Sequence, residues 1–295
     1  MPAANKSSLV TLGDFFRFAE RRFRLARLAY GHGTSNARDE AAFLVLEALR
    51  LPIHNIDPWL ALRPTPAERA QLLALIDARI SQRVPAPYLL GAAYMHGVRF
   101  HIDRRALIPR SFIGDMLADG ALPIGNPRRI RRILDLCTGS GCLAILAALA
   151  FPHARIDAVD LSAGALALAR RNVKSHRLGD RIALHRGDLF APLAGQRYDL
   201  IISNPPYVDA KAMARLPTEY RHEPRLALAA GDDGLAVVRR ILADAPRYLT
   251  RNGALLCEIG RGQKPLEAAF PRLPFLWLDT EQSTGEVFWI AADQL

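Results

Sequence analysis

The second half of the chain alternates short apolar, β-branched runs with longer stretches that have the period of a helix. A helix between two strands returns the chain to the edge of the sheet where it started. Strands joined in this way are therefore parallel, and their crossovers are right-handed. This alternation predicts an α/β fold with a doubly wound sheet. The successive segments are 130–135, 142–151, 155–160, 163–174, 181–185, 199–203, 235–249 and 254–259.

At the end of the chain, the pattern changes from crossovers to a hairpin. Residues 275–278 and 287–290 are both largely apolar, and the stretch between them contains Ser283, Thr284 and Gly285. Two short runs separated by turn-forming residues are typical of antiparallel strands. We expect the sheet to finish in an antiparallel terminal hairpin.

The front of the chain predicts a small helical bundle followed by a connector. A capping pair, Ser35 and Asn36, precedes the second of its helical stretches, and Pro66 stands at the first turn of the third. These stretches cover residues 9–30, 37–51 and 66–84, and residues 72, 75, 76, 79 and 80 keep a helical period in the third. After them, Val98 and Phe100 alternate with polar residues, as in one strand of a hairpin. We expect a helical domain at 1–90, a hairpin linker at 91–125 and a larger domain at 126–295.

The composition fits a folded chain in a reducing compartment. Of the 295 residues, 50% are hydrophobic and 23% charged, which is enough apolar material for a sizeable core. The N-terminal stretch lacks a basic segment leading into an apolar one, and no apolar run is long enough to cross a membrane. Cys137, Cys142 and Cys257 show no CxxC spacing. We therefore expect a cytoplasmic protein with reduced thiols, no membrane span and no metal site.

The positive charge of the chain is concentrated in its front part. The net charge of +10 divides into +5 for residues 1–100, +4 for 101–132 and +1 for 133–295. A basic region outside the predicted sheet domain indicates a polyanionic partner such as RNA. Ordinary solvated arginines on amphipathic helices explain the same excess equally well, and the sequence leaves both interpretations open.

A glycine-containing loop lies between the first predicted strand and its helix. Asp135 ends the strand, and the loop that follows contains Gly139 and Gly141. Glycines at such a turn let the backbone approach a ligand closely and enter the helix tightly, although packing alone also selects them. Cys137 replaces the first glycine of the dinucleotide-binding pattern. We predict cofactor contacts from this loop, at Asp135, Thr138, Gly139, Ser140 and Gly141.

The next two strands end on acidic residues that suit a nucleoside. Asp160, followed by Leu161, stands about twenty residues beyond the glycine loop, where a carboxylate accepts hydrogen bonds from ribose hydroxyls. After the third strand, Asp188 can accept from an adenine amine while Leu189 packs on the ring. The alternatives are structural: a residue next to the helix cap for Asp160, and a simple turn for Asp188. Together with the glycine loop they predict an adenosine-containing cofactor.

The tetrapeptide Asn204-Pro205-Pro206-Tyr207 (NPPY) follows the strand at 199–203 and carries the most specific signal. In an open α/β sheet, ligands bind outside the carboxyl ends of the strands, so this loop faces the same crevice as the glycine loop. The two prolines make the loop rigid and remove two backbone donors. The alternative interpretation of this motif is a structural Pro-Pro turn that only ends the strand.

The chemistry of NPPY suits a planar NH₂ group. Such a group donates one hydrogen bond to the side-chain oxygen of Asn204 and one to the carbonyl of Pro205. Tyr207 can contact its flat face. Held in this way, the nitrogen can be aimed at an electrophilic methyl group, so that catalysis rests on positioning. We predict Asn204, Pro205 and Tyr207 as catalytic residues, with Pro206 also in the substrate site.

In this order, the motifs resemble those of the Rossmann-like methyltransferases, and more narrowly the protein-glutamine methyltransferases of the translation apparatus. The resemblance covers nearly the whole chain. One branch of that family modifies peptide-chain release factors, and another modifies large-subunit ribosomal protein three. The segment 107–113 is similar to the ribosomal-protein branch, as are Asp135–Gly139 and Tyr220–Pro224. Within the first segment, the resemblance implies that Arg110 contributes to the substrate site.

The resemblance also implies a fold and a function. The fold is a Rossmann-like class I methyltransferase sheet with an antiparallel terminal hairpin, preceded by a helical substrate-recognition domain and a hairpin linker. The cofactor is S-adenosylmethionine, and Asn204 also touches it. The substrate is a glutamine of the ribosomal protein, with a pre-ribosomal particle and its RNA as the wider partner.

Several alternatives share these motifs. Glutamine methylation of release factors uses the same chemistry, and adenine-N6 methylation of nucleic acid presents another planar NH₂ to NPPY. The sequence shows no separate base-specificity domain. A non-catalytic assembly factor that only binds the cofactor would not need both Asn204 and Tyr207.

Overall fold

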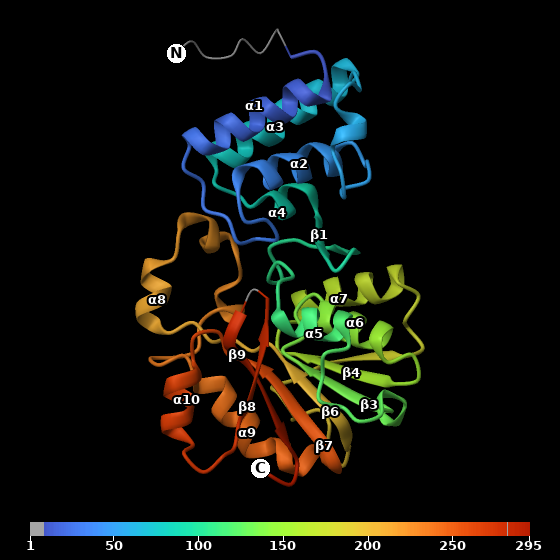
Figure 1. The fold of residues 1–295 in the computed structure, drawn as a ribbon, viewed down its shortest axis with the longest axis vertical. Helices are drawn as coiled ribbons and strands as arrows, with labels where there is room; N and C mark the ends of the chain where they lie inside the picture. The colour runs from blue at the N-terminus through green and yellow to red at the C-terminus, as the bar shows by residue number, and fades with distance from the viewer. Residues whose placement is uncertain (1–8, 282) are drawn as a thin grey trace. The chain divides into compact units, whose positions relative to one another are not determined.

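A computed structural model describes residues 9–281 and 283–295. The chain forms two compact units (Figure 1). The first contains the chain up to Ala93 together with Pro217–His222, and the second contains Tyr94–Leu216 and Glu223–Leu295. The expectation about the N-terminal stretch rests partly on residues 1–8, which lie outside the described residues. Within the described part, no helix is long and apolar enough to cross a membrane.

The first unit is helical, and its helices begin where the sequence provides caps. Thr11 and Asp14 form a capping box at the start of α1, Asn36 accepts two backbone N–H bonds at the start of α2, and Thr65 and Glu68 form a second capping box at α3. The helices of this unit are α1 (Leu12–Leu25), α2 (Ala37–Ala48), η2 (Asp57–Trp59), α3 (Pro66–Ser81) and α4 (Ala86–Leu90).

The helices pack around an apolar core. Phe15 and Phe23 from α1, Leu44 from α2 and Leu72 from α3 are all fully buried or nearly so. This burial supplies most of the stability that helices of such length lack in isolation. Helix α1 ends at Leu25, earlier than the sequence pattern predicted, because the chain takes the left-handed conformation at Arg27, with φ of 49°.

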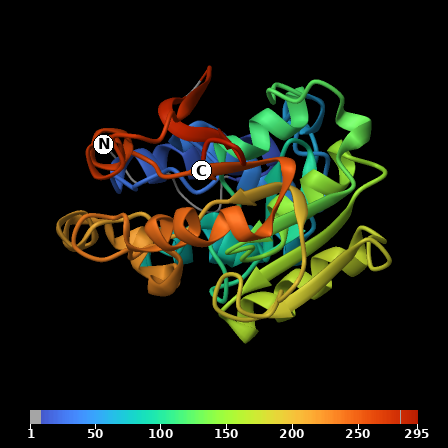
Figure 2. The ribbon, with the colours of Figure 1, turned by 90° about the horizontal axis from the view of Figure 1, so that it is seen from below.

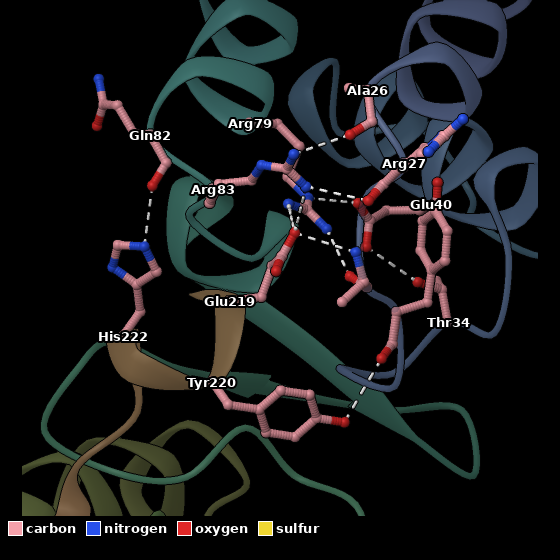
Figure 3. Close-up of polar contacts among 12 residues, drawn as sticks. Ala26, Arg27, Thr34, Glu40, Arg79, Gln82, Arg83, Glu219, Tyr220 and His222 are labelled. Carbon is pink, nitrogen blue, oxygen red and sulfur yellow. Dashed lines mark hydrogen bonds and ion pairs between the residues drawn. The ribbon is translucent and has the colours of Figure 1, made fainter. Parts of the chain in front are cut away.

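One charged residue lies on the otherwise apolar face of α3. Arg79 is fully buried and donates to the carboxylate of Glu40, and it lies 3.5 Å from Glu219 (Figure 3). Arg83, which is partly exposed, donates to the same Glu219 oxygen at 3.1 Å. Because buried charges are costly unless paired, these contacts explain how an arginine is tolerated at a core position.

Glu219 reaches this cluster because the segment Pro217–His222 belongs to the first unit. Its η4 turn (Thr218–His222) is anchored by several contacts (Figure 3). The Glu219 carboxylate accepts from the backbone N–H of Ala29 at 3.0 Å, and the Tyr220 ring lies against His32 with a centroid distance of 4.3 Å. A stretch that follows the NPPY motif is therefore part of the helical unit.

The second unit holds, within the described residues, a seven-stranded sheet in the order β5-β4-β3-β6-β7-β9-β8. Strands β3 to β7 run parallel, and β9 is antiparallel to both β7 and β8. This confirms the predicted class I methyltransferase sheet with its terminal hairpin. The strands are β3 (Arg132–Leu136), β4 (Arg155–Asp160), β5 (Ile182–Arg186), β6 (Tyr198–Ser203), β7 (Leu249–Glu258), β8 (Leu276–Thr280) and β9 (Ser283–Ala291). Gln282, in the expected turn, lies outside the described residues.

Helices cover both faces of the sheet, as a doubly wound arrangement requires. Side chains of α5 (Phe112–Asp119), α6 (Cys142–Ala150) and α7 (Ala163–Ser175) pack on one face, and side chains of α9 (Ala236–Tyr248) and α10 (Gln263–Ala269) pack on the other. Figure 2 shows the strands from below, with α9 in orange on one side of them. Central strands such as β6 are almost entirely buried, with a run of apolar residues at 200–202, because helices cover both of their faces.

The second unit also contains helices and short elements outside the seven-stranded sheet. A small two-stranded sheet pairs β1 with β2, which agrees with the hairpin predicted around Val98 and Phe100. The helices are α5 (Phe112–Asp119), α6 (Cys142–Ala150), α7 (Ala163–Ser175), α8 (Ala210–Arg215), α9 (Ala236–Tyr248) and α10 (Gln263–Ala269). The short elements are β1 (Ala92–Met95), β2 (Val98–His101), η3 (Pro127–Arg129) and η5 (Arg225–Ala227).

Candidate active site

A cavity of about 250 Å³ lies at the carboxyl ends of the parallel strands. Its walls come from the loops after β3, β4, β5 and β6, where an open α/β sheet binds ligands. The structure brings seven of the predicted residues together in its lining. These are Gly139, Asp160, Leu161, Asp188, Leu189, Asn204 and Pro206.

The glycine loop is held closely against β4. Cys137 takes a left-handed conformation with φ of 61°, which explains why glycine is usual at this position. The backbone N–H of Gly139 donates to Asp160 at 2.8 Å, and a Cβ added at Gly139 would meet open space. Gly141 is different: a Cβ there would lie 3.1 Å from that of Ala169, so this glycine lets α7 pack against the loop.

Asp135 lies beneath the loop and outside the cavity lining. It accepts from the Thr138 hydroxyl at 2.5 Å and from the N–H of Ala144 at 3.0 Å. Its other oxygen, Oδ1, is buried and has no hydrogen-bond partner among the described residues, and the same holds for the Ser140 hydroxyl. Burial raises the pKa of Asp135 to about 7. The loop therefore contains buried polar atoms that a bound polar ligand or a water could satisfy.

The two predicted nucleoside acids differ in their surroundings. Asp160 accepts from the N–H groups of Gly139 and Ser162, both at 2.8 Å, and burial raises its pKa. Asp188 is 51% exposed and forms an ion pair with Arg240 of α9 at 2.8 Å. Asp160 is thus rigidly oriented at the cavity wall, whereas Asp188 lies at its open rim.

The NPPY motif is held at both ends. Asn204 donates from its side-chain nitrogen to the Arg110 carbonyl at 3.3 Å. Tyr207, half-buried, donates from its hydroxyl to Glu258 at 3.3 Å. Its ring lies so close to the backbone of Gly260 that a Cβ there would be 2.7 Å from Cε2. Pro205 is buried, and among the four residues of the motif Asn204 and Pro206 line the cavity.

Arg110 is itself fixed by an ion pair. Its guanidinium makes a two-point contact with the Glu223 carboxylate, at 2.6 and 2.7 Å. Glu223 also accepts from the N–H of Ile108 at 3.2 Å. The residue predicted to bind substrate thus has its side chain engaged within the protein and presents its backbone carbonyl to Asn204.

Sequence reasoning missed Glu223 and Glu258 as partners of this site. Glu223 lies in the segment Tyr220–Pro224, whose resemblance to the family carried no role. Glu258 ends the strand beside the NPPY strand, and an acid at the carboxyl end of a predicted parallel strand was a usable signal. Arg105 and Arg240 also line the cavity, and their positions depend on chain paths that the sequence does not show.

The model of the methyltransferase small domain family matches residues 123–219, which contain the glycine loop and the NPPY motif. Ribosomal protein uL3 glutamine methyltransferase of Bradyrhizobium diazoefficiens is 56% identical, with 98% of this chain and 93% of that protein aligned. The enzyme of the same name from Bordetella pertussis is 51% identical over 99% and 98%. The chain belongs to the family of ribosomal protein uL3 glutamine methyltransferases.

A solved structure of the hMettl16 catalytic domain, in complex with a MAT2A 3'UTR hairpin, aligns at 18% identity. It covers 77% of this chain and 81% of that one, with a TM-score of 0.49.

Proposed function

We propose that this protein transfers a methyl group from S-adenosylmethionine to the side-chain amide nitrogen of a glutamine in ribosomal protein uL3. The names of relatives that match along nearly the full chain support this substrate. The predicted order of glycine loop, ribose acid and NPPY supports the reaction type.

The observation that carries the proposal is the orientation of Asn204. A carbonyl oxygen can only accept, so the amide group of Asn204 must turn its nitrogen toward the carbonyl of Arg110. Its oxygen is then the atom with which Asn204 can accept a hydrogen bond at the cavity. An acceptor in that place suits the NH₂ group of a glutamine side chain, which can donate but whose nitrogen does not accept well.

The residues of the cavity fit the cofactor. Asp160, rigidly held, would accept from the ribose hydroxyls, and Leu161 and Leu189 offer apolar contacts for the adenine. Asp188 would accept from the adenine amine at the rim. Open space above Gly139, in the loop that leads to the N-terminus of α6, suits the polar methionine end.

When bound beside Asp160 and the glycine loop, S-adenosylmethionine would supply a sulfonium methyl group for the amide nitrogen, with the thioether as leaving group and one N–H proton released. The chain's own contribution is positioning and electrostatic complementarity. Asn204 and the carbonyl of Pro205 orient the NH₂ group, and Tyr207 confines the amide plane. Pro206 closes the wall of the same cavity.

We assign the helical recognition domain to residues 1–90, the linker to 91–125 and the methyltransferase domain to 126–295.

Exposed arginines such as Arg21 and Arg24 of α1 suit a substrate within a pre-ribosomal particle in the cytoplasm, where RNA surrounds the protein. Arg21→Glu should raise the KM for uL3 bound to ribosomal RNA and leave the cofactor Kd unchanged. An unchanged KM would contradict the recognition role.

One assay tests the function against its alternatives. The enzyme is incubated with labelled S-adenosylmethionine and, in separate reactions, with purified uL3, a peptide-chain release factor and ribosomal RNA. Mass spectrometry of the digested uL3 should locate one added methyl group on a glutamine. Asn204→Ala enzyme serves as the control. Label found in the release factor or the RNA, with none in uL3, would overturn the proposal.

A further inference from the structure

Glu258 ends strand β7 directly beside the point where NPPY begins. The register pairs Ser203 of β6 with Cys257 of β7, so Asn204 and Glu258 leave the sheet as neighbours. Parallel strands bring their carboxyl ends to one edge of the sheet, and this edge carries the cavity. A carboxylate has therefore been placed immediately behind the motif that is proposed to hold the target amide.

The Glu258 side chain is buried, with 2% of the residue exposed, and it accepts hydrogen bonds on both oxygens. Oε1 accepts from the hydroxyl of Tyr207 at 3.3 Å. Oε2 accepts from the Ser111 hydroxyl at 2.6 Å and from the N–H of Phe112 at 2.9 Å. Within the part of the chain that the structure describes, no ion pair neutralises this carboxylate. Its negative charge is stabilised by donors from two other segments.

The two donors to Oε2 belong to the start of α5. Ser111 is the N-cap of this helix, and its hydroxyl accepts from the N–H of Ile113 while donating to Glu258. A helix N-terminus favours a negative charge. The same short segment provides, one residue earlier, the Arg110 carbonyl to which Asn204 donates. Both ends of NPPY are thus connected to residues 110–112, one directly and one through Glu258.

We propose that Glu258 is a positioning residue for methyl transfer, which ties the hydroxyl of Tyr207 to the start of α5 and thereby holds the NPPY loop against residues 110–112. This inference rests on the proposed function, because it assigns NPPY to the reacting amide. Gly260, just beyond Glu258, packs against the Tyr207 ring and restricts it further. Glu258 acts through Tyr207 and does not touch the substrate.

The hold on Tyr207 depends on the ionisation of Glu258. Burial, together with repulsion from Glu286 of β9, raises the pKa of Glu258 to about 7. The buried Cys257, on the same strand, and Tyr207 are further ionisable groups beside Glu258, and the charge of Arg110 acts on Tyr207. As a carboxylate, Glu258 accepts from Tyr207 and from α5 together. As an acid it carries a proton of its own, so the hydroxyl that faces this proton must accept where it now donates, and both contacts lose the negative charge that strengthens them.

The first test is a pH profile of methyl transfer to uL3 under single-turnover conditions with saturating cofactor. Wild-type rates should rise with pH through about 7, whereas Glu258→Gln should lose this rise and be about ten-fold slower at pH 8. Glu286→Gln, which removes a neighbouring carboxylate outside the hydrogen-bonded set, should keep the rise and move it to lower pH, because Glu286 raises the pKa of Glu258. Cofactor affinity and Tm of each variant report whether the fold is intact.

The second test is a double-mutant cycle with Tyr207→Phe, which keeps the ring and removes the hydroxyl. If Glu258 works through that hydroxyl, the double variant should be no slower than the slower single variant. Additive losses, or a Glu258→Gln enzyme with the wild-type profile, would overturn the proposal. If Glu258→Gln fails to fold, Tyr207→Phe alone must still lose the rise near pH 7. Wild-type enzyme that leaves uL3 unlabelled in the same assay contradicts the proposed function instead.

Discussion

Arg110 and Glu223 form a two-point ion pair, with nitrogen–oxygen distances of 2.6 and 2.7 Å, although they lie 113 residues apart. The Glu223 side chain is fully buried, and the backbone carbonyl of Arg110 accepts from Asn204. The ion pair therefore fixes the backbone atom that orients the proposed catalytic amide.

Arg110→Lys tests this relationship, because lysine offers one donor point where the guanidinium offers two. We expect turnover to fall about ten-fold and the free energy of unfolding to drop by ~1–3 kcal/mol. Arg239→Lys is the matched control, since Arg239 makes a similar but exposed pair with Asp233 and should change stability by less than ~1 kcal/mol. Denaturant unfolding and single-turnover rates measure both. Equal losses in the two variants would contradict the argument.

Substitutions of Asn204 test the proposed amide clamp. Asn204→Ala removes an acceptor of the target NH₂ group and should slow methyl transfer by about a hundred- to a thousand-fold. Asn204→Asp should keep cofactor affinity and still lose most turnover, because one carboxylate oxygen would face the Arg110 carbonyl, where the amide nitrogen now donates. Single-turnover rates with saturating cofactor decide the matter. An Asn204→Ala enzyme within three-fold of wild type would rule the clamp out.

The two acids of the cavity should contribute unequally to cofactor binding. Asp160→Ala removes the proposed ribose contact and also the acceptor that holds the N–H of Gly139, so we expect a loss of ~2–3 kcal/mol in binding free energy. Asp188→Ala, at the exposed rim beside Arg240, should cost less than ~1 kcal/mol. Calorimetric titration with S-adenosylmethionine measures the two. A reversed order would show that the carboxylates have been assigned to the wrong groups.

The stability of the fold should fall as the pH rises from 5 to 8. Burial raises the pKa of Asp135, from an ordinary value of 3.8, to about 7 in the folded protein. Folding therefore takes up a proton between these values, and its contribution is present at low pH and lost as the pH rises through about 7. For one such group, the free energy of unfolding should fall by up to about 1.4 kcal/mol per pH unit. Urea unfolding at several pH values should show a smaller slope for Asp135→Asn, and an unchanged slope would contradict the assignment.

The buried cluster of the helical unit makes a further prediction. Arg79→Met leaves the fully buried Glu40 without its ion pair and should destabilise the unit by ~3–5 kcal/mol. Arg83→Met removes the partly exposed partner of Glu219 and should cost ~1 kcal/mol or less. Hydrogen exchange of α1 to α3, with denaturant unfolding, separates the two. Similar losses would mean that burial does not decide the strength of these pairs.

Local patterns in the sequence were sufficient for the architecture of the second unit. The alternation of strands and helices predicted the doubly wound sheet, and the apolar runs around residue 285 predicted the hairpin that β8 and β9 form. The same reasoning brought the glycine loop, Asp160 and Asn204 to one edge, because parallel strands end on the same side. These features depend on residues close in the chain, whose period and turn-forming residues can be recognised directly in the sequence.

The interactions between distant segments could not be predicted from such local patterns. The helical period included Arg79 on the buried face of α3, yet its partners Glu40 and Glu219 stand 39 and 140 residues away. Nothing local to Pro217–His222 indicated that it joins the helical unit, and nothing local to Glu258 indicated a bond to Tyr207. A buried charge is stable only where the path of the chain brings its partner within hydrogen-bond distance. That path depends on packing of the whole molecule, which periodicity along a single segment does not contain.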